Sequence, residues 1–165
     1  MTGSEIHALA AELGVRLAAR HAMCVTAESC TGGLVAGAIT DVAGSSGWFE
    51  RGFATYSNEA KVELLGVPPA TIVQHGAVSE ATARAMAEGA LARTPAHVAV
   101  AITGVAGPGG GSVDKPVGMV CFAWAGRGTP TRVATGHFGG DRRAIRYAAV
   151  VEALNGLLAQ AAILP

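Results

Sequence analysis

The hydrophobic positions of this chain switch repeatedly between helical and extended spacing. In the helical stretches apolar residues recur every three or four positions, and several stretches start at a residue that is favoured at helix N-termini. Glycine closes one of them, as is common at helix C-termini. The pattern predicts five helices: from Ser4 to about Arg20, over residues 31–40, from Asn58 to Gly66, over residues 79–93, and from Asp141 to about Leu158.

Short runs of β-branched, aromatic and small apolar residues lie between the helices. Five strands are predicted, over residues 23–27, 51–56, 97–103, 117–124 and 132–138. Residues 97–103 form an almost unbroken apolar run, which is typical of a strand buried on both faces. The last two strands follow each other without a helix, so at least one of them must pair antiparallel. The sequence therefore predicts an α/β fold, a three-layer α/β/α sandwich with a mixed, mostly parallel sheet of about five strands.

The amino-acid composition indicates which kinds of molecule the chain is expected to bind. Of the 165 residues 50% are hydrophobic and 15% charged, which is enough to fill the core of a single domain over residues 1–165. Twelve basic residues balance twelve acidic ones, which argues against nucleic acid or a membrane surface as a partner. No stretch approaches the roughly 18 to 20 apolar residues that span a bilayer, and the first residues do not resemble a signal peptide. We expect a cytoplasmic protein that acts on a small molecule.

Neither the cysteines nor the histidines have metal-binding spacing. Cys24, Cys30 and Cys121 form no CxxC pair, and their odd number argues against a disulfide framework. The five histidines lack a spacing such as HxxxH, and acidic residues do not cluster as DxD. We therefore expect no metal and no cofactor.

Unusual polar and glycine-rich segments follow three of the predicted strands. They read AESCTGG, YSNEAK and ITGVAGPGGGS. In an open α/β sheet the ligand crevice lies beyond the carboxyl ends of the strands, so these segments are expected to be neighbours. Helix starts and glycine turns expose backbone N–H groups that favour a phosphate or an oxyanion. No Gly-Lys dipeptide occurs, so the phosphate loop GxxxxGK[ST] is excluded.

Five blocks of sequence together resemble a known family. They are TAESCTGG at residues 26–33, AGSSGWFERGFATYSNEAK at 43–61, QHGAVSE at 74–80, ITGVAGPGGGS at 102–112 and KPVG at 115–118. These blocks, in this order, resemble the carboxy-terminal domain of the CinA family of competence- and damage-inducible proteins. The resemblance runs from about Glu5 to the last helix and is closest to the form that stands alone, without the additional amino-terminal domain of larger members.

The resemblance implies an activity and a set of catalytic residues. Members hydrolyse the carboxamide of nicotinamide mononucleotide to nicotinate mononucleotide and ammonia, without a metal, on a three-layer fold with a mixed sheet, as homo-oligomers that are usually dimers. The family's serine, lysine and tyrosine map onto Ser46, Lys61 and Tyr56. Lysine has an ordinary pKa of about 10.4, so Lys61 could act as a base only if burial or a nearby positive charge lowers that pKa.

Further residues of the same blocks are expected to bind the nucleotide. Thr103 and Arg143 match pocket positions of the family, and Arg143 is expected to grip the 5′-phosphate bidentately. Glu28 could orient ribose hydroxyls or Lys61, or cap a helix. The glycine turns supply the rest of the expected substrate-binding set, which is Ser29, Thr31, Gly32, Gly104 and Gly107.

Several alternatives remain at the sequence level. Ser45 or Ser29 could replace Ser46 as the nucleophile. Ser112 and Lys115 spell SxxK, but the glycines before them and Pro116 after them deny the pair the helical turn that this motif needs. The whole chain could instead be a nucleotide-binding regulatory module without hydrolytic activity, or a phosphohydrolase that needs a divalent ion.

Overall fold

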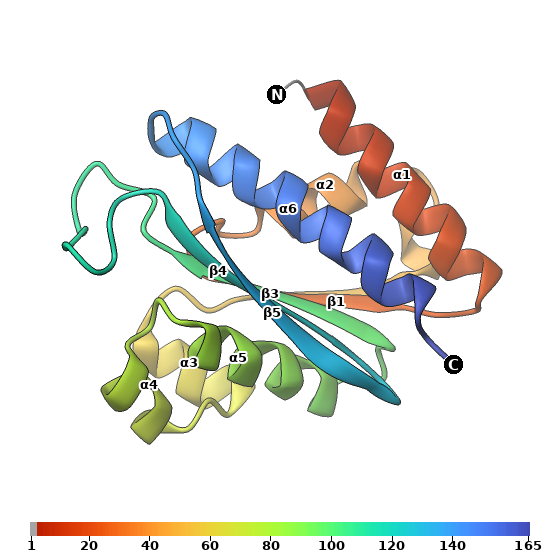
Figure 1. Ribbon diagram of the computed structural model, residues 1–165. Coiled ribbons are helices and arrows are strands. Elements are labelled where there is room, and N and C mark those ends of the chain that lie inside the picture. Colours follow the sequence, from red (N-terminus) through yellow and green to blue (C-terminus); the bar gives the residue numbers. More distant parts are fainter. Residues whose placement is uncertain (1–2) are drawn as a thin grey trace.

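The computed structural model describes residues 3–165, so the first two residues of the predicted domain lie outside the described part. Figure 1 shows how its helices and strands are arranged. In chain order the elements are α1 (Gly3–Ala19), β1 (Cys24–Glu28), α2 (Leu34–Thr40), η1 (Ser45–Gly47, a single 3-10 turn), β2 (Phe49–Ala54), α3 (Asn58–Leu65), α4 (Pro69–His75), α5 (Glu80–Ala92), β3 (Val98–Gly104), β4 (Met119–Gly126), β5 (Thr129–His137) and α6 (Arg142–Ala162).

The five strands form one mixed sheet in the order β2-β1-β3-β4-β5. β1 pairs parallel with β2 on one side and with β3 on the other. β4 pairs antiparallel with both β3 and β5, so four strands point one way and β4 points the other. The predicted fold class is confirmed, including the antiparallel pairing of the late strands.

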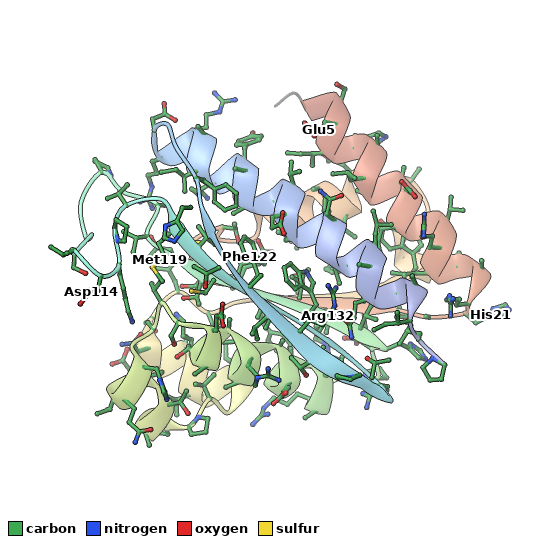
Figure 2. All side chains as sticks on the ribbon, in the orientation of Figure 1. Glu5, His21, Asp114, Met119, Phe122 and Arg132 are labelled. Atoms are coloured by element: carbon green, nitrogen blue, oxygen red, sulfur yellow. The ribbon has the colours of Figure 1, made fainter. Side chains whose placement is uncertain are left out.

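Helices cover both faces of the sheet. α1, α2 and α6 lie on one face, and α3, α4 and α5 lie on the other (Figure 1). Phe122 of β4 is buried between the sheet and α6, where its ring stacks on Trp124 (Figure 2). The opposite face packs smaller side chains, such as Ala99 and Ala101, against α5. Within residues 3–165, no helix is both long and apolar enough to cross a membrane.

Helix α3 is held closely against α5. A Cβ atom at Gly89 of α5 would overlap the carbonyl oxygen of Leu65, the last residue of α3. Gly66 follows with φ +67°, and a side chain there would meet the guanidinium of Arg93. Because glycine needs no space for a side chain, these two positions let α3 approach α5 backbone to backbone.

Three local predictions differ from the structure. α4 was not predicted, because Pro68 and Pro69 indicate a loop, but Pro69 occupies the first turn of this helix, where proline is well tolerated. Ser57 caps α3 by accepting a hydrogen bond from Ala60 N, so Asn58 is the first helical residue rather than the cap. α2 begins at Leu34, and the preceding residues form a turn with Gly33 at φ +106°.

Candidate active site

The three polar segments that follow β1, β2 and β3 meet, as expected, at one edge of the sheet. They enclose a cleft of about 300 Å³ together with the start of α6. The side chains and loops that line it include Ser29, Cys30, Tyr56, Asn58, Lys61, Thr103, Gly104, Gly107 and Arg142. The cleft therefore lies where ligands bind in open α/β sheets, beyond the carboxyl ends of parallel strands.

Lys61 projects from the first turn of α3 into the closed end of this cleft. Its side chain is only 1% exposed. Nζ lies 3.0 Å from Ser29 Oγ. It also donates to the main-chain carbonyls of the preceding segment, at 2.9 Å to Thr55 O and 3.2 Å to Tyr56 O. The amine is thus fixed by backbone groups of its own loop and directed at a serine hydroxyl.

Burial changes the acidity of this lysine. Desolvation lowers the pKa of Lys61 below its ordinary value, against a smaller opposing effect from Cys30. Within residues 3–165 no carboxylate lies at ion-pair distance from Nζ to stabilise the charged form. The neutral amine that a general base requires is therefore more accessible here than at the protein surface.

Ser29 is the first residue after β1. Its N–H donates to Ile102 O at 2.9 Å, which continues the ladder with β3 for one residue beyond the strand. The chain then leaves the sheet in a turn closed by a hydrogen bond from Gly32 N to Ser29 O. Ser29 is 9% exposed, so its hydroxyl reaches the cleft from an otherwise buried position.

The carboxylate of Glu28 accepts three backbone N–H groups at the start of α2. Oε1 accepts from Gly33 at 3.2 Å and Val35 at 2.9 Å, and Oε2 accepts from Ala36 at 3.0 Å. The side chain is 1% exposed and does not line the cleft. Of the roles considered from the sequence, the structure shows the helix cap.

Arg142 and Tyr56 form the outer wall of the cleft. The Arg142 guanidinium donates to Gly107 O at 2.7 Å and to Tyr56 Oη at 3.1 Å. It therefore links the glycine-rich loop, the segment after β2 and the start of α6. Tyr56 is 65% exposed, so its ring stands at the mouth of the cleft rather than beside Ser29.

Three more predicted residues line the cleft. Thr103 is buried, and its hydroxyl donates to Ala77 O at 2.8 Å. Gly104 packs against Val120, and Gly107 has φ +73° and packs against Val117. Both glycines sit where a side chain would collide with β4 or with the loop that precedes it. They shape the wall of the cleft.

The structure does not bring Ser46 together with Lys61. Ser46 is exposed in η1, before the start of β2, where Cys24 N donates to Trp48 O at the amino end of β1. Lys61 contacts carbonyls that follow the carboxyl end of β2. The six residues of β2 separate the two, which is roughly 20 Å of extended chain. The predicted pairing of Ser46 with Lys61 is wrong in its geometry, and Ser29 occupies the expected place.

Three of the predicted substrate-binding residues lie outside the cleft. Arg143 points to another surface, where its guanidinium stacks on Tyr147 at 5.4 Å. Consecutive helix residues point about 100° apart, so Arg142 faces the cleft and its neighbour does not. Thr31 is buried and Gly32 faces Arg146, so neither lines the cleft.

Sequence reasoning missed Arg142, Asn58 and Cys30 as cleft residues. Arg142 and Asn58 could have been found from their places, one at the first helical position after the Asp141 cap and the other between Tyr56 and Lys61. Burial raises the pKa of the Cys30 thiol to about 11, so this thiol stays protonated at neutral pH.

Other candidate sites do not show the same chemistry. Ser112 and Lys115 form a non-helical turn, and Lys115 Nζ donates to His75 O, as the rejection of the SxxK motif anticipated. A second hollow of about 300 Å³ lies between α1, α2 and α6, but neither serine nor lysine lines it. Across residues 3–165, no three His, Cys, Asp or Glu side chains are grouped to hold a metal ion.

Comparisons with known proteins agree in sequence and in fold. Residues 6–161 match the family model described as the CinA C-terminal domain. The chain is 54% identical over 163 residues to the nicotinamide-nucleotide amidohydrolase PncC of Escherichia coli (strain K12), with 97% of each chain covered. It is 52% identical over 153 residues to the protein of the same name from Pseudomonas putida, with 93% of this chain and 95% of the relative covered.

A solved structure gives the same result. The crystal structure of competence/damage inducible protein CihA from Agrobacterium tumefaciens superposes with a TM-score of 0.93 at 48% identity. The match covers 94% of this chain and 95% of that one. Residues 6–161, which match the family model, include every element that surrounds the cleft.

Proposed function

Because the chain belongs to the CinA C-terminal domain family, we propose that it is a nicotinamide-nucleotide amidohydrolase in which Ser29 is the nucleophile and Lys61 the general base. The contact of 3.0 Å between Lys61 Nζ and Ser29 Oγ carries this proposal. The similarity to relatives named nicotinamide-nucleotide amidohydrolase supports the substrate class. The substrate is nicotinamide mononucleotide and the products are nicotinate mononucleotide and ammonia.

The carbonyl groups around Lys61 orient its lone pair. A neutral amine has two N–H donors and one lone pair. Thr55 O and Tyr56 O, at 2.9 and 3.2 Å from Nζ, accept the two hydrogens, because the third carbonyl, Ser57 O, lies farther away at 3.5 Å. The lone pair is then left for the hydroxyl of Ser29, which donates its proton to Nζ. Backbone groups thus prepare the amine for proton abstraction without a carboxylate that would keep it charged.

The reaction proceeds through an ester on Ser29. As the Ser29 proton passes to Lys61, Oγ bonds to the carboxamide carbon and the carbonyl electrons move to oxygen. Lys61 returns the proton to the amide nitrogen, the C–N bond breaks and ammonia leaves. Lys61 then accepts a proton from water, whose oxygen attacks the ester. Collapse releases the nicotinate product, and the proton on Lys61 returns to Ser29.

The turn after Ser29 supplies a donor for the oxyanion. The N–H groups of Gly32 and Gly33 are already bonded to Ser29 O and to Glu28. That of Cys30, which lines the cleft, donates to no backbone or carboxylate oxygen of the described chain. An N–H beside the nucleophile stabilises the charge that develops on the carbonyl oxygen.

Arg142 binds the 5′-phosphate at the mouth of the cleft. It is the arginine that lines the cleft, and a guanidinium can bind a phosphate through two parallel hydrogen bonds. The phosphate would then lie on the exposed side, near Tyr56 and the glycine-rich loop, while the nicotinamide points towards Ser29. Because Glu28 occupies the start of α2, that helix is not available for the phosphate.

The test is ammonia release from nicotinamide mononucleotide by the purified protein in the presence of EDTA. We expect ammonia and nicotinate mononucleotide in equal amounts, with no dependence on a divalent ion. Nucleotide binding without ammonia at any pH would instead favour a binding module. Phosphate release that EDTA abolishes would favour a phosphohydrolase.

A further inference from the structure

The turn that carries Ser29 has little intrinsic rigidity. Gly32 and Gly33 have positive φ values of +59° and +106°, in the region that glycine enters without strain. Two backbone hydrogen bonds, from Gly32 N to Ser29 O and from Leu34 N to Thr31 O, close the turn from within. A reactive hydroxyl on so short and glycine-rich a turn needs support from outside the turn if its position is to be fixed.

Glu28 supplies support from the strand side. Its carboxylate binds the N–H groups of Gly33, Val35 and Ala36 and so joins the last residue of β1 to the first turn of α2. The turn is fastened at both ends, because Glu28 also pairs with Ala54 and Ile102 in the sheet. The carboxylate charge is compensated by these amides and makes no ion pair with Lys61.

Arg146 supplies support from α6. Its Nε donates to Cys30 O at 3.1 Å and its Nη2 donates to Thr31 O at 3.2 Å. These are the two carbonyls directly after the nucleophile. Arg146 does not line the cleft of Ser29. It contacts the turn from outside that cleft.

The hydrogen bond from Arg146 to Cys30 O also fixes the direction of the Thr31 N–H. In a trans peptide the carbonyl of one residue and the N–H of the next point in opposite directions. Because Arg146 holds the carbonyl of Cys30, the N–H of Thr31 must point away from Arg146. Arg146 therefore fixes the orientation of the peptide plane that joins Cys30, which lines the cleft, to Thr31.

We propose that Glu28 and Arg146 are positioning residues that hold the Ser29 turn from two sides and so align the nucleophile and the peptide that follows Cys30. The inference rests on the proposed function, because it takes Ser29 as the nucleophile. Neither side chain lines the cleft, so their loss should lower kcat while leaving KM almost unchanged. Oxyanion donors and aligned nucleophiles act in the transition state rather than in substrate binding.

The experiment compares Arg146→Met, Arg146→Lys and Glu28→Gln with the wild type. Matched controls are Arg16→Met and Glu12→Gln, because these two residues form an exposed pair on α1. Three quantities are measured for each protein. They are kcat and KM for nicotinamide mononucleotide, the melting temperature, and the rate at which a fluorophosphonate probe modifies Ser29, followed by intact-mass spectrometry. In that modification a P–O bond forms at Oγ and fluoride leaves.

We expect Arg146→Met and Glu28→Gln to lower kcat and the labelling rate about tenfold to a hundredfold, with KM within about twofold. Arg146→Lys should recover part of the loss, because an ammonium can still bind one carbonyl. The controls should match the wild type. If Glu28→Gln fails to fold, the two Arg146 variants decide the matter.

Full kcat and full labelling in Arg146→Met, with or without a lower melting temperature, would overturn the proposal. So would a rise in KM alone. A wild-type protein that labels at Ser29 but releases no ammonia would refute the proposed function, while its labelling rates still test the role of the two residues. A wild-type protein without labelling at Ser29 would refute both.

Discussion

The turn at residues 29–33 and the single turn η1 both place serines beside the sheet, at opposite ends of it. The first follows the carboxyl end of β1, where the segments after β2 and β3 also end. The second precedes β2, and its Ser46 is exposed. Three loops surround Ser29 together with the buried amine of Lys61, whereas η1 lies at the other end of β2. Strand direction, more than distance along the sequence, decides which serine lies beside Lys61.

Substitution of the two serines tests this contrast with the largest expected effect. Ser29→Ala removes the nucleophile and should lower kcat about ten-thousandfold. The kcat of Ser46→Ala should stay within about twofold of the wild-type value, because an exposed hydroxyl outside the site contributes little. Ammonia release under saturating nucleotide measures both. Loss of turnover in the Ser46 variant, with Ser29→Ala active, would reverse the assignment.

The two lysines of the chain provide the next contrast. Lys61→Met removes the base and should lower kcat roughly a thousandfold. Lys115→Met is the matched control. Its kcat should remain within about threefold of the wild type, because Lys115 lies outside the cleft and its Nζ donates to His75 O. Single-turnover ammonia release distinguishes the two. Comparable losses of kcat in both variants would show that turnover does not depend on the contact between Lys61 and Ser29.

Neighbouring arginines at the start of α6 give a smaller effect. Arg142→Met should raise KM for the nucleotide about tenfold to a hundredfold, the range expected for lost charge-assisted hydrogen bonds. Arg143→Met should leave KM unchanged, because its guanidinium stacks on Tyr147. The KM for nicotinamide riboside, which lacks the phosphate, should change much less in Arg142→Met. An equal loss for riboside and nucleotide would exclude the phosphate contact.

The acidity of Lys61 gives the smallest effect, on stability. Its folded-state pKa lies below the ordinary value of 10.5 because of burial. Between these two pKa values the unfolded chain holds a proton that the folded chain has released, so the free energy of unfolding rises with pH there. Below the folded-state pKa both states are protonated, and this rise is absent.

Urea unfolding of wild type and Lys61→Met over the alkaline range measures that slope. The wild type should gain stability relative to the variant as pH rises through the window, and kcat/KM should rise over the same range as the amine loses its proton. Parallel stability profiles for the two proteins would mean that the lysine is not desolvated in solution.

The sequence predicts the sheet well because the chemistry of each strand is local. The apolar run around Val100 and the absence of a helix between β4 and β5 correctly indicate a buried strand and an antiparallel pair. α4 is missed for the opposite reason. Its prolines are typical of loops, but Pro69 stands at the first helical position and the segment contacts α5.

The sequence predicts which segments form the site, but not which side chains contact one another there. Topology alone brings the three glycine-rich and polar segments together, so Lys61 and Thr103 fall where expected. Which serine meets the amine depends on the end of the strand from which each serine leaves, and which arginine meets the substrate depends on helix rotation. Both are properties of three-dimensional direction that residue types do not encode.

The close approach of α5 to α3 has a consequence at a distance. The helix that carries the amine rests, at its last carbonyl, on a backbone with no side chain at Gly89. A methyl group at Gly89 would overlap Leu65 O, and α3 would have to move away from α5 to make room for it. The position of Lys61 thus depends on the absence of a side chain at a residue that does not line the cleft.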